Sequence, residues 1–305
     1  MVQADKKLFE HVVVLGLGAL GGSVAKALHS FKLANKVSGY AFPTDVELAL
    51  ADGTIDQACA NDAELALAVA TADCVVLALP VSQSIKKLSL IAQHLPINAV
   101  LTDVCSVKQG LIDCAQQTLQ NRADQFVASH PIAGSHLSGY GAARADLFEG
   151  AMVIIEPARQ TSLHAKSVAN VSTLWRALGA SVQTMDGSEH DKLYALISHL
   201  PHMTAYALMN AMIAQYGEMP PEKIARLMAP LIGGGFKDST RIAGSSPALW
   251  ADIAIANKVA LSGAIKETIL QLAHIDRALQ SGEQQVLQDL LAPASQLRDL
   301  INKAQ

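Results

Sequence analysis

Three short segments carry side chains that can move a proton or hold a carboxylate. Ser129-His130-Pro-Ile-Ala-Gly-Ser135 places a histidine directly after an apolar, strand-like run. Ser198-His199-Leu-Pro-His202 lies within a helical pattern, and Phe236-Lys-Asp-Ser-Thr-Arg241 precedes Trp250. A neutral histidine is a suitable general base for an alcohol proton near neutral pH, and an arginine can grip a carboxylate with two parallel hydrogen bonds. The segments therefore favour base chemistry on a substrate with a carboxylate.

Each segment also has a simpler interpretation. A single histidine at a strand end is often a structural hydrogen-bonding group. His199 and His202 share one helix face at a spacing of three, but no acidic residue repeats at ligand spacing there, so substrate contact or structural bonding is favoured over a metal. Asp238 and Arg241 could form a surface pair at helical spacing. No metal site is predicted.

A glycine-rich turn indicates a dinucleotide site. Gly16-Leu-Gly-Ala-Leu-Gly21 follows the apolar run His11–Leu15 and opens a helix-like segment, which is the context that gives this motif its meaning. The first glycine permits a tight turn, the second lets a pyrophosphate approach the backbone, and the third allows close packing of helix on strand. The predicted cofactor contacts are Gly16, Gly18, Ala19, Leu20, Gly21, Thr44, Leu79 and Pro80.

The choice between NAD and NADP stays open. An acidic residue at the end of the second strand would bind the ribose hydroxyls and repel a 2′-phosphate, but the segment Gly39–Thr44 contains neither an acid nor a base. Thr44 could bond either form, and Asp45 lies further along.

The apolar pattern predicts two parts. Strand-like runs at residues 11–15, 36–41, 74–79, 99–103, 126–129 and 151–155 alternate with helical segments. This alternation is typical of a Rossmann-type, doubly wound parallel sheet. Residues 1–157 are therefore assigned to an NAD(P)-binding α/β domain, and residues 158–305 to an all-α domain for substrate binding and dimerisation, apart from one short strand candidate at 181–185. A long helix is expected from an N-cap at Ser188 to about Ile213, bent at Pro201.

Composition excludes several classes of protein. The 305 residues have a formal net charge of −4 and no run of like charges that would serve a nucleic acid or a membrane surface. The beginning of the chain has no apolar core of a signal peptide, and apolar stretches end before bilayer length, so a cytoplasmic location is expected. The four cysteines show no zinc-site spacing and are interpreted as reduced thiols.

Taken together and in this order, the motifs resemble the prephenate dehydrogenase family, which includes arogenate and cyclohexadienyl dehydrogenases. The resemblance covers nearly the whole chain. It rests on the segments His130-Pro-Ile-Ala-Gly134, Ser198–His202 and Phe236–Arg241, together with Trp250. It implies NAD(P)-dependent oxidative decarboxylation of prephenate or arogenate in tyrosine biosynthesis, and an intertwined homodimer formed by the helical domain.

The resemblance also implies roles for single residues. His130 matches the base that takes the proton of the ring C4 hydroxyl, and Ser106 matches a serine that helps hold this hydroxyl and the base. Arg241 matches the arginine that grips a substrate carboxylate. The residues matched to the substrate pocket are Ser198, His199, His202, Ser135, His136 and Trp250 of the same or the partner subunit. Many family members have an acid at the position of His136. Because a histidine suits the oxo acid side chain of prephenate better than the amine of arogenate, prephenate is favoured.

Two other functions are compatible with a two-domain, dinucleotide-binding chain. Other two-domain dehydrogenases, of the β-hydroxyacid type, commonly use a lysine on the long helix, whereas no lysine follows Lys192 in this one. A non-catalytic NAD(P)-binding sensor could keep the fold and lose the chemistry. The joint presence of His130, Ser106 and Arg241 argues against it.

Overall fold

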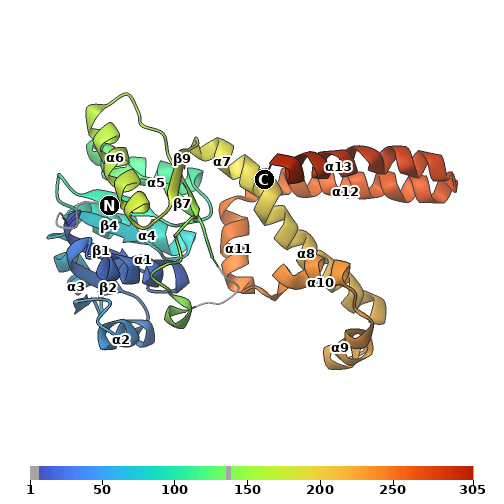
Figure 1. The fold of residues 1–305 in the computed structure, drawn as a ribbon, viewed down its shortest axis with the longest axis horizontal. Helices are drawn as coiled ribbons and strands as arrows, with labels where there is room; N and C mark the ends of the chain where they lie inside the picture. Colours follow the sequence, from blue (N-terminus) through green and yellow to red (C-terminus); the bar gives the residue numbers. More distant parts are fainter. Residues whose placement is uncertain (1–6, 135–138, 305) are drawn as a thin grey trace. The chain divides into compact units, whose positions relative to one another are not determined.

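The computed structural model describes residues 7–134 and 139–304 (Figure 1). The chain divides into two compact units, Met1–Asn257 and Lys258–Gln305.

The first unit is built on a six-stranded parallel sheet with the strand order β3-β2-β1-β4-β5-β6. The order turns back at β1 and β4, as in a doubly wound sheet. The predicted Rossmann-type fold is thereby confirmed. The strands are β1 Phe9–Leu15, β2 Ala34–Tyr40, β3 Gln57–Ala58, β4 Cys74–Leu77, β5 Val100–Asp103 and β6 Phe126–Val127.

Helices cover both faces of this sheet because its central strands are apolar on both sides. In β1, Val12 and Val14 belong to one buried cluster, and Val13 and Leu15 belong to the other. All four side chains are fully buried, as expected for a parallel strand between two helical layers. α1 Ala19–Ser30 and α2 Pro43–Ala51 pack into the first cluster, while α3 Asp62–Val69, α4 Val81–His94 and α5 Gln109–Leu119 pack into the second.

A second sheet of three strands, β7-β8-β9, follows the first (Figure 1). The predicted strand at residues 126–129 is in fact divided, since β6 ends at Val127 and Ser129 already begins the antiparallel β7. β8 pairs in parallel with β9, and α6 connects them. The expected boundary between residues 157 and 158 would cut this β-α-β unit, so the α/β part, defined by its strands, extends to Thr184. The bounds are β7 Ser129–Ile132, β8 Met152–Ile155, α6 Ser162–Ala177 and β9 Ser181–Thr184.

The expected long helix is present but differs in two details. Its N-cap is Asp186 and not Ser188, because the Asp186 carboxylate accepts the backbone N–H groups of Ser188 and Glu189 at 2.9 and 3.3 Å. Before Pro201 the chain does not simply kink: Ala195–His199 form a π-helical turn, η3, between α7 Gly187–Tyr194 and α8 Leu200–Tyr216. A π turn takes up one additional residue and commonly occurs at functional sites.

The rest of the first unit is helical. The Ser246 side chain caps α11 through the Leu249 N–H, and Pro247 occupies the first turn. Apolar side chains here remain exposed, with Leu231 79% and Ile255 70% accessible. The helices are α9 Pro221–Met228, α10 Gly234–Thr240 and α11 Pro247–Ala256, with short 3-10 turns at Ala229–Leu231 and Arg241–Gly244.

The second unit is a pair of helices, α12 Lys258–Ser281 and α13 Gln284–Ala304. It also exposes apolar side chains, among them Val259, Ile269, Leu297 and Leu300. Within residues 7–134 and 139–304, no single helix is long and apolar enough to cross a membrane; only the consecutive helices α11 and α12, taken together, reach that length and apolarity.

Candidate active site

The glycine-rich turn between β1 and α1 has the geometry that dinucleotide binding needs. Gly16 has a φ of +95°, and a Cβ there would collide with the Ala78 carbonyl at the end of β4. A Cβ on Gly21 would collide with the Gly16 carbonyl, so the first and third glycines are required by the turn itself. A Cβ on Gly18 would meet no atom within 4 Å, and α1 begins there without a side-chain cap. Open space before uncapped N–H groups fits a pyrophosphate.

The other predicted cofactor residues surround the same edge of the sheet. Leu79 and Pro80 follow β4 and lead into α4, and both are partly exposed. Thr44 lies exposed in the first turn of α2. Asp45 accepts the Tyr140 N–H at 3.2 Å, so this carboxylate is already engaged with the backbone.

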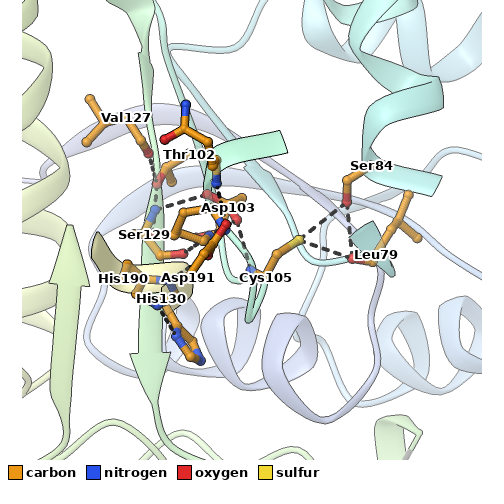
Figure 2. A network of polar contacts seen from close by, with 12 residues as sticks. Leu79, Ser84, Thr102, Asp103, Cys105, Val127, Ser129, His130, His190 and Asp191 are labelled. Carbon is orange, nitrogen blue, oxygen red and sulfur yellow. Dashed lines mark hydrogen bonds and ion pairs between the residues drawn. The ribbon is translucent and has the colours of Figure 1, made fainter. Parts of the chain in front are cut away.

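A buried ion pair joins β5 to β7 through Asp103 and Ser129, which Figure 2 labels. Lys108 Nζ binds the Asp103 carboxylate and donates to the Ser129 carbonyl at 2.6 Å, and both charged side chains are almost fully buried. Asp103 Oδ1 accepts the Ser129 N–H at 2.9 Å, and Oδ2 accepts the Cys105 N–H at 2.9 Å. The pair thus fixes the position at which the chain leaves the first sheet, one residue before His130.

His130 lies in β7 and faces a second histidine from α7. Its Nδ1 is 2.8 Å from His190 Nε2, and His190 Nδ1 is 2.9 Å from Asp191 Oδ1. Figure 2 shows these side chains meeting from β7 and α7. Asp191 in turn accepts the backbone N–H groups of Lys108 and Gln109 at 2.8 and 2.9 Å, at the start of α5.

The surroundings of His130 favour its neutral form. Burial, reinforced by the charge of Lys108 and by His190 and His199, holds the pKa of His130 well below its ordinary value of 6.5. The Tyr194 ring contacts the ring of His130 edge-on, with centroids 4.8 Å apart. A neutral imidazole is the form that can accept a proton.

The Ser198–His202 segment contributes a second group of rings. His199 is fully buried, its Nδ1 lies 3.1 Å from the Asn257 side-chain amide, and burial lowers its pKa to about 4. His202 stacks on Trp250 with centroids 3.5 Å apart, and Trp250 meets the His199 ring at 6.1 Å. Ser198 contributes its carbonyl oxygen, which lies 3.0 Å from His202 Nδ1.

Arg241 begins a 3-10 turn after α10 and is exposed to solvent. Burial lowers the pKa of His202, and the positive charge of Arg241 lowers it further. Among the described residues no ion pair between Asp238 and Arg241 is formed. The surface-pair interpretation of this spacing is therefore wrong.

Of three further predicted residues, the structure describes only Ser106. Ser106 lies in the loop after β5, partly exposed, and its side chain makes no hydrogen bond to His130 among the described contacts. Ser135 and His136 lie outside the described residues. In the part of the chain that the structure describes, no group of three acidic, histidine or cysteine side chains could hold a metal ion.

Sequence reasoning missed several polar residues of the site. The sequence patterns assign no role to His190, Asp191 or Lys108. Asp103 and Lys108 flank Ser106, and an acid directly at the end of an apolar strand was the one signal that could have pointed to them. The cysteines are free, and burial raises the pKa of Cys105 to about 12, so it stays a thiol against Leu79 and Ser84.

Comparison with protein families matches both parts of the chain. Residues 24–184 match the nucleotide-binding domain of prephenate dehydrogenase, and residues 186–293 match its dimerization domain. The chain is 33% identical over 290 residues to prephenate dehydrogenase of Bacillus subtilis, covering 94% of this chain and 75% of that protein. It is also 33% identical over 279 residues to cyclohexadienyl dehydrogenase of Zymomonas mobilis, covering 90% of each.

Comparison with solved structures also identifies prephenate and arogenate dehydrogenases as similar proteins. The crystal structure of prephenate dehydrogenase from Aquifex aeolicus with hydroxyphenyl propionate and NAD+ has a TM-score of 0.83 at 32% identity, covering 96% of this chain and 98% of that one. Synechocystis arogenate dehydrogenase has a TM-score of 0.75 at 27% identity over 95% and 99%. A 3-hydroxyisobutyrate dehydrogenase of Mycobacterium tuberculosis, at 12% identity and a TM-score of 0.53, covering 85% of this chain and 94% of that one, shares the fold alone.

Proposed function

The chain belongs to the prephenate dehydrogenase family, and from this premise we propose that it oxidatively decarboxylates a cyclohexadienyl acid to form a tyrosine precursor. The observation that carries the proposal is His130, a buried histidine whose surroundings keep it neutral. It lies in β7 just beyond the carboxyl end of β6, the side of a parallel sheet at which α/β folds bind ligands. The β-hydroxyacid alternative has only a likeness of fold behind it.

His130 supplies the base. Its Nδ1 is engaged with His190, so Nε2 is the nitrogen that takes the proton of the C4 hydroxyl. As the O–H bond breaks, its electron pair forms the carbonyl at C4, and the C4 hydride leaves. A nicotinamide dinucleotide supplies the acceptor for this hydride, and the open space at Gly18 fits its pyrophosphate. The C1–carboxylate bond then breaks and carbon dioxide departs. The bonding pair completes the aromatic ring, while the carbonyl pair at C4 moves to the oxygen, which takes up a proton to give the phenol.

The helical part of the first unit supplies the substrate's other contacts. Arg241, which is exposed and has no ion-pair partner among the described residues, is proposed to hold a substrate carboxylate with two parallel hydrogen bonds. His199, His202 and Trp250 would line the pocket and limit the entry of water, since their rings already pack together. Ser106, which is partly exposed, would help orient the hydroxyl.

Two finer assignments rest on sequence alone. Prephenate is proposed as the preferred substrate, because Ser135-His136 provides no acid to pair with the amine of arogenate. Either NAD or NADP is proposed to serve, because Gly39–Thr44 supplies neither an acid to repel a 2′-phosphate nor a base to hold it.

The helical half is proposed to form a homodimer. It matches a dimerization domain, and exposed side chains such as Leu231, Ile255 and Val259 present more apolar surface than a monomer normally leaves in water. Sedimentation at micromolar concentration should therefore give about twice the mass of 32.1 kDa. A single species at the monomer mass would contradict the proposal.

A matrix of initial rates tests the function directly. Prephenate or arogenate is combined with NAD or NADP, and the increase in reduced-cofactor absorbance is followed together with release of carbon dioxide. Turnover is expected with prephenate and either cofactor, and slower turnover with arogenate. Binding of NAD(P) without turnover of either acid would support the non-catalytic sensor instead.

A further inference from the structure

A chain of three buried side chains, His130, His190 and Asp191, connects the proposed base to the start of α5 (Figure 2). We propose that His190 and Asp191 are positioning residues, which hold neutral His130 with its proton on Nδ1 and stabilise the imidazolium that forms when Nε2 takes the substrate proton. The proposal rests on the assignment of His130 as the base.

The direction of each hydrogen bond follows from Asp191. Its two carboxylate oxygens accept the backbone N–H groups of Lys108 and Gln109, at 2.8 and 2.9 Å, so the group acts as an acceptor. His190 Nδ1, 2.9 Å from Asp191 Oδ1, must therefore carry the proton of that contact. In neutral His190 the other nitrogen, Nε2, then has a free electron pair.

The same reasoning extends to His130. Because His190 Nε2 is an acceptor and lies 2.8 Å from His130 Nδ1, the proton of neutral His130 stands on Nδ1. Its Nε2 then has the electron pair needed to accept a proton. If neutral His130 carried its proton on Nε2 instead, two nitrogens without protons would face each other across 2.8 Å.

The charged groups around the chain keep this arrangement fixed. On one side, Lys108 is held by Asp103 and its backbone N–H binds Asp191. On the other side, Tyr194 stacks on His190 with centroids 4.3 Å apart and planes 15° apart. His199 is the remaining titratable group close to His130, and its lowered pKa keeps it neutral at pH 7. Asp191 is therefore the anion to which the His130–His190 pair is directly connected.

Proton balance follows from the geometry. When His130 Nε2 takes the hydroxyl proton, the ring becomes an imidazolium that donates from Nδ1 to His190 Nε2. The positive charge is then shared along a hydrogen-bonded line that ends on the Asp191 carboxylate. A hydrogen bond to a charged group contributes about 1.5–3 kcal/mol, roughly a 10- to 100-fold effect on rate if it is made fully in the transition state.

Substitution of His190 separates positioning from a purely structural role. Asp191 is less suited to this purpose because it also caps α5. His190→Leu removes the acceptor, whereas His190→Gln keeps an amide oxygen that can accept from His130 Nδ1. His164→Gln is the matched control, because His164 is equally buried but its Nδ1 accepts only the Arg159 N–H at the start of α6.

We expect His190→Leu to lower kcat about 10- to 100-fold, with the KM of the substrate and the Kd of NAD within about twofold of the wild type. The acidic limb of its kcat–pH profile should move to lower pH, because the imidazolium of His130 loses its hydrogen-bond acceptor. His190→Gln should recover most of kcat, and His164→Gln should resemble the wild type. The proposal is overturned if His190→Leu keeps kcat within twofold, or if both His190 variants lose activity equally.

A second measurement does not depend on turnover. The ¹⁵N chemical shifts of labelled histidine should show His130 protonated at Nδ1 in the wild type, and a mixture of tautomers in His190→Leu. Protonation of His130 at Nε2 in the neutral wild type would contradict the positioning role even if the enzyme is active. Conversely, the expected tautomer in a protein that turns over no cyclohexadienyl acid would leave the positioning geometry intact and overturn only the proposed function.

Discussion

The site has a base side around His130 and a carboxylate side around Arg241, and they differ in how many of their polar side chains have a partner within one chain. On the base side, His130, His190, Asp191, Asp103 and Lys108 are all buried, and each has a hydrogen-bonding partner. On the carboxylate side, Arg241 is exposed and takes part in no ion pair among the described residues, and His202 is only half-buried, against Trp250.

This difference indicates separate roles for the two sides in catalysis and in substrate binding. A base whose orientation is fixed before the substrate arrives needs little rearrangement in the transition state. A cation without a protein partner keeps its hydrogen-bonding capacity for a substrate carboxylate. Changes on the base side should therefore reduce kcat or folding stability, and changes on the carboxylate side should raise KM.

The largest effect is expected from the base itself. His130→Asn retains a hydrogen-bonding side chain but removes the proton acceptor, so kcat should fall about 10²- to 10⁴-fold, the usual contribution of general base catalysis. The Kd of NAD, measured by fluorescence titration, should stay within about twofold. A kcat near that of the wild type would show that another group is the base.

The buried ion pair should make the next largest contribution, to stability. Lys108→Met leaves the Asp103 carboxylate buried without its partner, which should lower the free energy of unfolding by about 3–5 kcal/mol in urea denaturation. The control is Lys87→Met, which breaks a pair with Asp62 at the surface and should cost under about 1 kcal/mol. Equal losses in the two variants would mean that the base side is not held by this pair.

The carboxylate side should respond in binding. Arg241→Ala should raise the KM of the substrate about 10- to 100-fold, equivalent to roughly 1.5–3 kcal/mol, with a much smaller change in kcat. Arg241→Lys should recover little, since lysine lacks the planar fork. Arg144→Ala, at an exposed pair with Asp146, serves as control. A KM of Arg241→Ala within about twofold would assign the carboxylate contact to another residue.

Some features of the fold and the site were predictable from the sequence, and others were not. The parallel sheet and the turn at Gly16–Gly21 follow from local patterns, an apolar run followed by glycines at fixed spacing, so they were predictable.

The base-side network was not predictable because its bonds join distant positions. His130 and His190 are 60 residues apart, and Lys108 and Asp191 are 83 apart. No local pattern marks such pairs. The helix start after β9 shows a smaller limit: Asp186 and Ser188 are both good N-caps, and in the structure Asp186 takes this role.

The pH dependence of kcat/KM tests the central claim, that neutral His130 is the base, most directly. Because the protonated ring cannot accept a proton, kcat/KM should fall as pH decreases through the pKa of His130 in the free enzyme. Burial holds that pKa well below 6.5, so the wild type should keep nearly full kcat/KM down to pH 6.5 and lose it only at more acidic pH. The acidic limb should be absent in His130→Asn and present in His202→Asn. An acidic limb that survives in His130→Asn and disappears in His202→Asn would contradict the account.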